Sequence, residues 1–154
     1  MGDWNRTTKE IPIEKIRSEI TSAIEMHLEE YELGPILNNY LLCIETYSEK
    51  KKKGLFSGGG DKWVITNAII TPDWLIIGGM GEKQSEFGLS VKRSEMQAED
   101  YKESVNNKYL PDNGVNISGV FTGRVGMHGN QRVTVFIPLG EEPISNQFKK
   151  YLLA

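Results

Sequence analysis

The sequence predicts an α+β fold in which a bent antiparallel sheet is flanked by an N-terminal and a C-terminal helix. Residues 11–33 carry apolar side chains at three- and four-residue spacing, as an amphipathic helix does. Residues 36–140 contain β-branched segments separated by turn signals, as antiparallel strands do. Residues 141–153 return to helical spacing. At 154 residues we expect a single domain, 1–154, with one core.

The first helix is expected to begin near Pro12, because the missing N–H of proline costs nothing in a first helical turn. Gly34 and Pro35 are expected to end it. Its apolar stripe consists of Ile13, Ile16, Ile20, Ala23, Ile24, His27, Leu28 and Tyr31. This stripe must be buried against the rest of the domain or against a second copy of the chain. Residues 1–10 are polar, and we expect them to be frayed.

The β core is expected to begin with a strand over residues 40–47, whose first half is apolar on both faces. Residues 62–71 are dense in β-branched side chains and predict a second strand. A turn at Pro72-Asp73 joins it to a returning strand over residues 74–77. The glycine-rich residues 78–81 are expected to end that strand.

Residues 82–113 are harder to interpret. Residues 86–91 alternate weakly and indicate a short strand. Residues 94–97 fit the capping box of a helix, but the apolar stripe that follows is poor. We prefer a short strand over residues 95–98 followed by an irregular loop.

The last hairpin and helix are better defined. After a turn at residues 111–114, alternation over residues 115–122 and 132–139 predicts two paired strands. Pro138 indicates that the second of them lies at an edge, since proline cannot donate to a ladder. The final helix has an apolar stripe of Ile144, Phe148, Tyr151 and Leu152.

Composition excludes several function classes. The net charge of −3 argues against a general nucleic-acid binder, which usually carries a basic excess. No apolar run approaches the ~18 residues that a membrane span needs, and residues 1–6 lack an apolar signal core. The single cysteine, Cys43, lies among apolar residues and is expected to be a buried side chain in a reducing compartment. We therefore expect a cytoplasmic protein.

The densest charge in the chain is a run of four lysines, Lys50, Lys51, Lys52 and Lys53, in the loop between the first two expected strands. Leu55 and Phe56 follow it, and then three glycines. One interpretation is that the lysines contact an anionic partner while Leu55 and Phe56 insert into it. The other is that the lysines are solvated and prevent edge-to-edge aggregation, while the two apolar side chains pack back onto the sheet.

The closing step RVTVFIPLGEEPISNQFKKYL, together with the order of elements, resembles a bacterial-type pleckstrin-homology-like (PH-like) domain. The resemblance covers about residues 38–153. It implies a partly open barrel capped by the C-terminal helix, with Phe148 and Leu152 as anchors. It also implies that the loop of the first hairpin binds phosphorylated lipid head groups. Lys62 is the basic residue on the second strand of that hairpin. The helix over residues 11–33 is an addition to the family's fold.

Residues with catalytic or metal-binding chemistry are few. His27 lies on the apolar stripe of the first helix, which favours a buried core histidine. His128 lies in a glycine-flanked hairpin tip, which favours an exposed one. Neither has the carboxylate or cysteine spacing of a common metal site. The glycine runs at residues 58–60 and 78–81 lack the following helix that a nucleotide loop needs. We predict no catalytic residue, metal or cofactor.

The expected function is therefore a non-enzymatic binding module that recognises an anionic surface through the loop at residues 50–62. That surface is either lipid head groups, which would make the protein peripheral at the membrane, or an acidic protein segment. The charge would come from Lys50, Lys51, Lys52, Lys53 and Lys62, and the burial from Leu55 and Phe56. The alternative is a protein-interaction module in which the helix over residues 11–33 pairs between copies as a homo-oligomer.

Overall fold

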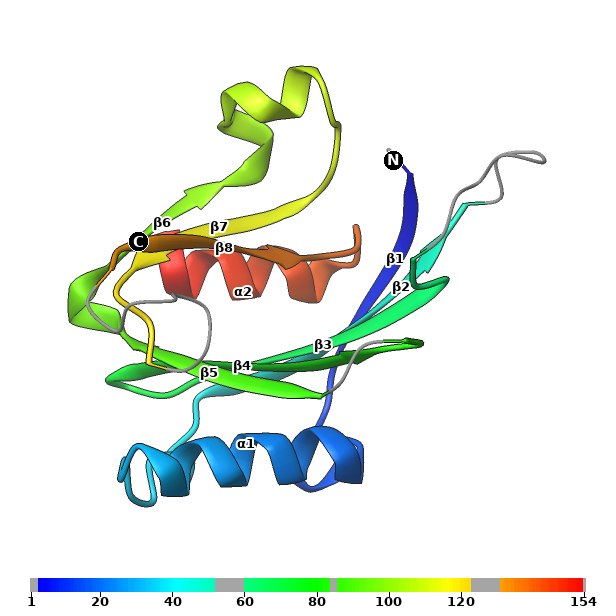
Figure 1. Ribbon diagram of the computed structural model, residues 1–154. Coiled ribbons are helices and arrows are strands. Elements are labelled where there is room, and N and C mark those ends of the chain that lie inside the picture. The colour runs from blue at the N-terminus through cyan, green and yellow to red at the C-terminus, as the bar shows by residue number, and fades with distance from the viewer. Residues whose placement is uncertain (1–2, 52–59, 84–85, 123–130, 154) are drawn as a thin grey trace.

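The computed structural model describes residues 3–51, 60–83, 86–122 and 131–153. Within these residues the chain forms two antiparallel sheets and two α-helices (Figure 1). The five-stranded sheet comprises, in spatial order, β1 (Trp4–Glu10), β2 (Leu42–Lys50), β3 (Trp63–Ile70), β4 (Trp74–Gly81) and β5 (Phe87–Lys92). The three-stranded sheet comprises β6 (Met96–Asp100), β7 (Gly114–Gly119) and β8 (Val133–Pro138). The helices are α1 (Ser18–Glu30) and α2 (Pro143–Leu153), and short 3-10 turns are η1 (Ile13–Lys15), η3 (Arg93–Glu95), η4 (Tyr101–Glu103) and η5 (Val105–Lys108).

The elements form layers on the two faces of the five-stranded sheet. Figure 1 shows α1 below that sheet, and the three-stranded sheet with α2 above it. One apolar core lies between the two sheets and includes Phe148 and Leu152 of α2. A second core lies between α1 and the opposite face of the five-stranded sheet. Within the described residues, an isolated bridge between Ser90 and Thr122 is the β pairing that joins the two sheets, so they do not close into a barrel.

The α+β class and most of the strands are confirmed. The first half of β2 is buried on both faces, as its continuous apolar pattern predicts. β6 confirms the short strand that we preferred after residue 94, and the segment that follows it contains two 3-10 turns. β8 is an edge strand, as Pro138 indicates. The predicted stripe of the last helix faces the core between the sheets.

The expectation that residues 1–10 are frayed is wrong. β1 pairs with β2 over its full length, from Trp4 opposite Lys50 to Glu10 opposite Ile44. Two of its inward side chains, Arg6 and Thr8, are polar, and each finds a polar partner. For example, the hydroxyls of Thr8 and Thr46 lie 2.8 Å apart and are both buried. Because these inward side chains are polar, β1 shows no apolar alternation in the sequence. Their partners lie far along the chain, so the sequence near β1 does not reveal them.

The first helix is shorter than predicted. The expected helix over residues 11–33 is divided into η1 and α1, because Ile16 and Arg17 adopt extended backbone angles. The apolar stripe of α1 packs on the five-stranded sheet of its own chain, with Ile20 and Ile24 almost completely buried. The stripe is therefore covered within one copy of the chain.

Residues 78–81 do not end a strand, because β4 continues through them to Gly81. Gly78 lies opposite Gly88 on β5, and α1 packs directly over this pair. A Cβ atom at Gly78 would lie 2.8 Å from Cδ1 of Ile24, and one at Gly88 would lie 3.0 Å from the carbonyl oxygen of Ala23. The glycines therefore let the helix approach the sheet closely.

Candidate functional site

Three of the predicted charge-bearing residues lie together at one end of the five-stranded sheet. Lys50 ends β2, Lys51 follows it, and Lys62 directly precedes β3. The backbone N–H of Lys50 donates to the carbonyl of Lys62 at 2.8 Å, so the two residues lie side by side. The N–H of Lys51 donates to the carbonyl of Asp3 at 2.9 Å, which fixes the start of the chain beside them. The other predicted residues, Lys52, Lys53, Leu55 and Phe56, lie outside the described residues, as does His128.

A fourth lysine, Lys83, joins this group and was not predicted. β3 and β4 pair with Val64 opposite Gly81, so the same register places Lys62 opposite Lys83. The N–H of Lys83 donates to a carboxylate oxygen of Asp61, the residue next to Lys62. Both Lys62 and Lys83 are exposed. The turn at Pro72-Asp73 could have revealed this pairing. In a hairpin centred on these two residues, Lys62 and Lys83 lie ten positions before and after the turn and therefore face each other.

We call Lys50, Lys51, Lys62 and Lys83 the basic end. When the registers of β2 with β3 and of β3 with β4 are continued past the ends of these strands, Lys50, Lys62 and Lys83 fall in one row. Strand spacing places the backbones at the two ends of this row about 10 Å apart. The next residues in sequence, 52 and 53, are two further lysines.

Acidic residues also occur at the basic end, but the carboxylates of two of them accept hydrogen bonds from backbone N–H groups. The side chain of Asp61 is buried and accepts from the Lys83 N–H. An oxygen of Glu82 accepts from the N–H of Lys62 at 3.3 Å. These short carboxylates are held close to the main chain, whereas lysine side chains are long enough to extend their charge away from it.

A second exposed feature lies between β6 and β7. Val105, Tyr109 and Leu110 are 75%, 82% and 67% exposed, and we call them the apolar tip. Backbone hydrogen bonds of η4 and η5 order the segment, and the hydroxyl of Tyr101 donates to the carbonyl of Leu110 at 2.7 Å. Large apolar side chains held out by an ordered backbone are typical of a contact surface. The sequence did not reveal the tip, since its spacing gave only a poor helical stripe.

The basic end and the apolar tip are connected through β1. Arg6 forms an ion pair with Asp112, at 2.6 Å between Nη2 and Oδ2, and Asp112 follows the tip by two residues. Asp3, which accepts from the N–H of Lys51, lies just before β1 and three residues before Arg6, or about 10 Å of extended chain. Figure 1 shows the start of β1 and the segment between β6 and β7 on the same upper side of the molecule.

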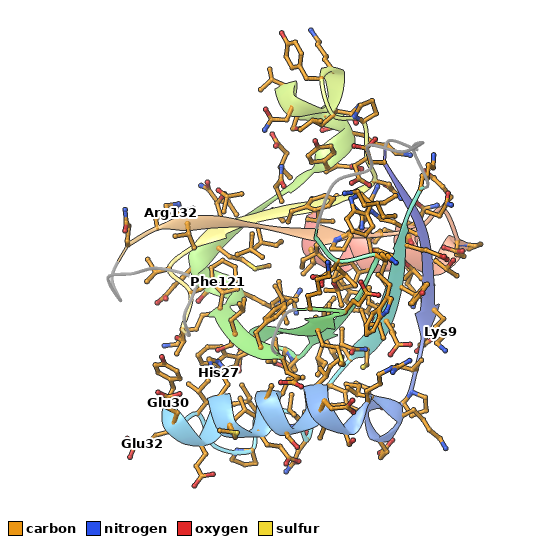
Figure 2. All side chains as sticks on the ribbon, turned by 45° about the vertical axis from the view of Figure 1, so that its right-hand side comes forward. Lys9, His27, Glu30, Glu32, Phe121 and Arg132 are labelled. Atoms are coloured by element: carbon orange, nitrogen blue, oxygen red, sulfur yellow. The ribbon has the colours of Figure 1, made fainter. Side chains whose placement is uncertain are left out.

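His27 is a buried core histidine, as predicted. Figure 2 shows it on the face of α1 that is turned toward the sheet. Its Nε2 atom lies 2.8 Å from the hydroxyl of Ser90 on β5, and both residues are buried. Burial lowers the pKa of His27, while the charge of Glu30 opposes that shift. Because Ser90 has no exposed surface, this Ser–His pair fastens α1 to β5 and has no access to a substrate in solution.

Cys43 is also buried, and burial together with the nearby charges of Glu45, Glu10 and Glu14 raises its pKa to about 12.

Among the described residues, no group of three or more His, Cys, Asp or Glu side chains is arranged to hold a metal ion. Within the same part of the chain, no helix combines the length and the apolar character needed to cross a membrane.

Comparison with known proteins finds no significant match for this chain among protein-family models, curated proteins or solved structures.

Proposed function

We propose that this protein binds an anionic membrane surface through the basic end. The observation that carries the proposal is the row formed by Lys50, Lys62 and Lys83, with Lys51 beside it. Each lysine near an anionic bilayer contributes about 1 kcal/mol, so these four and the adjoining Lys52 and Lys53 support a salt-sensitive attachment. The protein would be cytoplasmic and peripheral at the membrane.

The apolar tip favours a membrane over an acidic protein segment as the anionic partner. Tyrosine is enriched at the interface between lipid and water, and leucine and valine gain free energy when they leave water. All three side chains of the tip are already held in solvent, so their insertion requires no unfolding of the core. An amphipathic surface of this kind suits a bilayer, which offers both charge and an apolar interior.

A PH-like relationship remains our proposal for the fold. It is supported by α2, whose Phe148 and Leu152 enter the core between the two sheets. The hairpin of β2 and β3, with the basic end at its tip, corresponds to the first hairpin of that family. β1 and α1 would then be additions that cover one edge and one face of the larger sheet.

Assembly through the first helix is the weaker alternative. The stripe that would pair between copies is packed on β4 and β5 of the same chain, and Ile20 and Ile24 are buried there. Met26 remains 69% exposed on α1. We therefore treat a dimer that depends on Met26 as an outcome to be looked for in the test.

The test is co-sedimentation of the full chain with vesicles of phosphatidylcholine alone or mixed with phosphatidylserine, at low and high salt. Three variants are compared, each with all named residues changed to Ser. The loop variant changes Lys50, Lys51, Lys52 and Lys53; the row variant changes Lys62 and Lys83; the tip variant changes Val105, Tyr109 and Leu110. A control variant changes the exposed Lys9, Lys15 and Lys150, which lie elsewhere.

We expect salt-sensitive binding to the anionic vesicles alone. The loop and row variants should weaken it, the tip variant should weaken it without changing its salt dependence, and the control should not affect it. Failure to bind anionic vesicles at low salt would refute the membrane proposal. If a polyglutamate peptide then bound through the same lysines, the acidic-protein reading would replace it. If the chain sediments as a dimer without vesicles, and Met26→Ser abolishes that dimer, the result would favour assembly through α1.

A further inference from the structure

A cavity of about 390 Å³ lies on the opposite side of the molecule from the apolar tip. It is open to solvent and is bordered by η1, α1, the segment at residues 36–40 and the outer face of β3. Ile16, Ile24 and Ile69 are buried residues of its lining, and Leu37 adds a partly buried apolar wall. Its volume falls within the range of small-molecule sites, which are mostly apolar with a few placed polar groups.

The walls of the cavity are fixed by the backbone. Extended angles at Ile16 and Arg17 separate η1 from α1, and residues of both elements line the cavity. The opposite wall is a series of tight turns, in which Ile36 donates to Gly34 at 2.9 Å and Tyr40 donates to Leu37 at 3.3 Å. The space is therefore built by ordered main chain rather than left by a missing side chain.

The charged side chains that line the cavity are both acidic. Glu14 and Glu25 are exposed, and neither forms a hydrogen bond or ion pair within the part of the chain that the structure describes. Lys15 and Arg17 lie close in sequence but do not line the cavity. Glu14 is also among the charges that raise the pKa of Cys43, whose strand partner Ile69 belongs to the lining.

We propose that this cavity binds a small aliphatic ammonium compound. The alkyl chain would lie on the isoleucine-lined floor, and the ammonium group would remain at the mouth between Glu14 and Glu25. The hydroxyls of Thr21 and Tyr40, which also line the cavity, would serve as further hydrogen-bond acceptors. An alkyl carboxylate of the same length would be repelled, and a neutral alcohol would gain only the apolar contact.

This site is independent of the proposed membrane binding. α1 and the apolar tip lie on opposite sides of the five-stranded sheet (Figure 1). The cavity is bordered by acids, whereas the basic end carries lysines. Failure of one proposal therefore leaves the other standing.

The test is isothermal titration of the full chain with hexylammonium, 1-hexanol and hexanoate, with butyl- and pentylammonium to complete a chain-length series. We expect hexylammonium to bind at least about tenfold more tightly than 1-hexanol, and hexanoate to show no binding. Each methylene added from butyl to hexyl should tighten binding by about fourfold, as burial of a CH₂ group does.

Two variants separate charge from fold. The double variant Glu14→Gln with Glu25→Gln should reduce the affinity for hexylammonium to that for 1-hexanol and leave the alcohol unaffected. Glu29→Gln, on the same helix but outside the cavity lining, should change neither. Equal affinities for the three probes, no binding of hexylammonium, or a preference for it that survives in the double variant would each overturn the proposal.

Discussion

Arg6 and Asp112 form a bidentate ion pair between the first strand and the segment that follows the apolar tip. Nε donates to Oδ1 at 2.8 Å and Nη2 donates to Oδ2 at 2.6 Å. The third nitrogen, Nη1, donates to the hydroxyl of Ser48 at 2.6 Å. The guanidinium also lies 5.4 Å and 5.7 Å from the ring centroids of Trp4 and Phe136. One side chain therefore fastens β1 to β2, β8 and the base of the tip.

Replacement of Arg6 by Ala should lower the free energy of unfolding by about 2–3 kcal/mol, because it leaves the Asp112 carboxylate without its partner in a largely buried position. Arg6→Lys should recover only part of this loss, since an ammonium group cannot reproduce the planar fork. Urea unfolding of the three proteins measures the differences.

Lys9→Ala is the matched control on the same strand. Its ammonium lies 3.6 Å from Glu45, and its side chain is 66% exposed. Figure 2 shows Lys9 on the outer side of β1. Such an exposed ion pair contributes at most about 1 kcal/mol. Equal losses for Arg6→Ala and Lys9→Ala would mean that the Arg6 contacts do not stabilise the fold.

The difference between β1 and β3 explains how far the fold can be predicted from the sequence. β3 is buried on both faces by β-branched side chains, so its own composition identifies it. β1 is defined by polar pairs with Ser48, Thr46 and Asp112, which lie far along the chain. A polar strand of this kind looks like a frayed terminus until its partners are known.

The residues of the candidate site also differ in how far the sequence predicts them. Lys50 and Lys62 could be predicted because a lysine run beside a hairpin is visible in the sequence. Lys83 requires the register of β3 and β4, which only the position of the intervening turn reveals. The apolar tip could not be predicted, since apolar residues are ordinarily expected to be buried and nothing local shows that Tyr109 and Leu110 face solvent.

Gly78→Ala should destabilise the protein by about 1–3 kcal/mol, because the new methyl group would press α1 away from β4. The nearest atom would be Cδ1 of Ile24 at 2.8 Å. Ile24→Ala removes that atom and Cγ1 of the same side chain, which would lie at 2.9 Å, so the double variant should lose less stability than the sum of the two single variants. Thermal or urea unfolding of the four proteins tests this cycle, and strict additivity would contradict the close packing.

Cys43 should react slowly with thiol reagents in the folded protein. The residue has no exposed surface, and its pKa of about 12 leaves almost no thiolate at neutral pH. We expect labelling by iodoacetamide at about pH 8 to become rapid only in denaturant. Mass spectrometry of the labelled chain measures the rate, and fast labelling under native conditions would show that β2 opens readily.

The burial of His27 should make stability depend on pH in the mildly acidic range. Its pKa is lowered in the folded state by burial and raised in part by Glu30, with the ring of Tyr31 5.0 Å away. Below the unfolded value of about 6.5, the unfolded chain binds a proton that the folded chain does not, so unfolding becomes more favourable as pH falls. The loss has a slope of at most about 1.4 kcal/mol per pH unit and ends below the folded-state pKa.

His27→Gln removes this titration and keeps a side chain able to bond with Ser90. The carboxylates are common to both proteins, so their titration cancels in the comparison. The stability of the parent relative to His27→Gln should therefore fall between about pH 7.5 and about pH 5.5 in urea unfolding. A constant difference would contradict the shift. Glu30→Gln removes the charge that opposes it, so that variant should continue to lose stability to a lower pH than the parent.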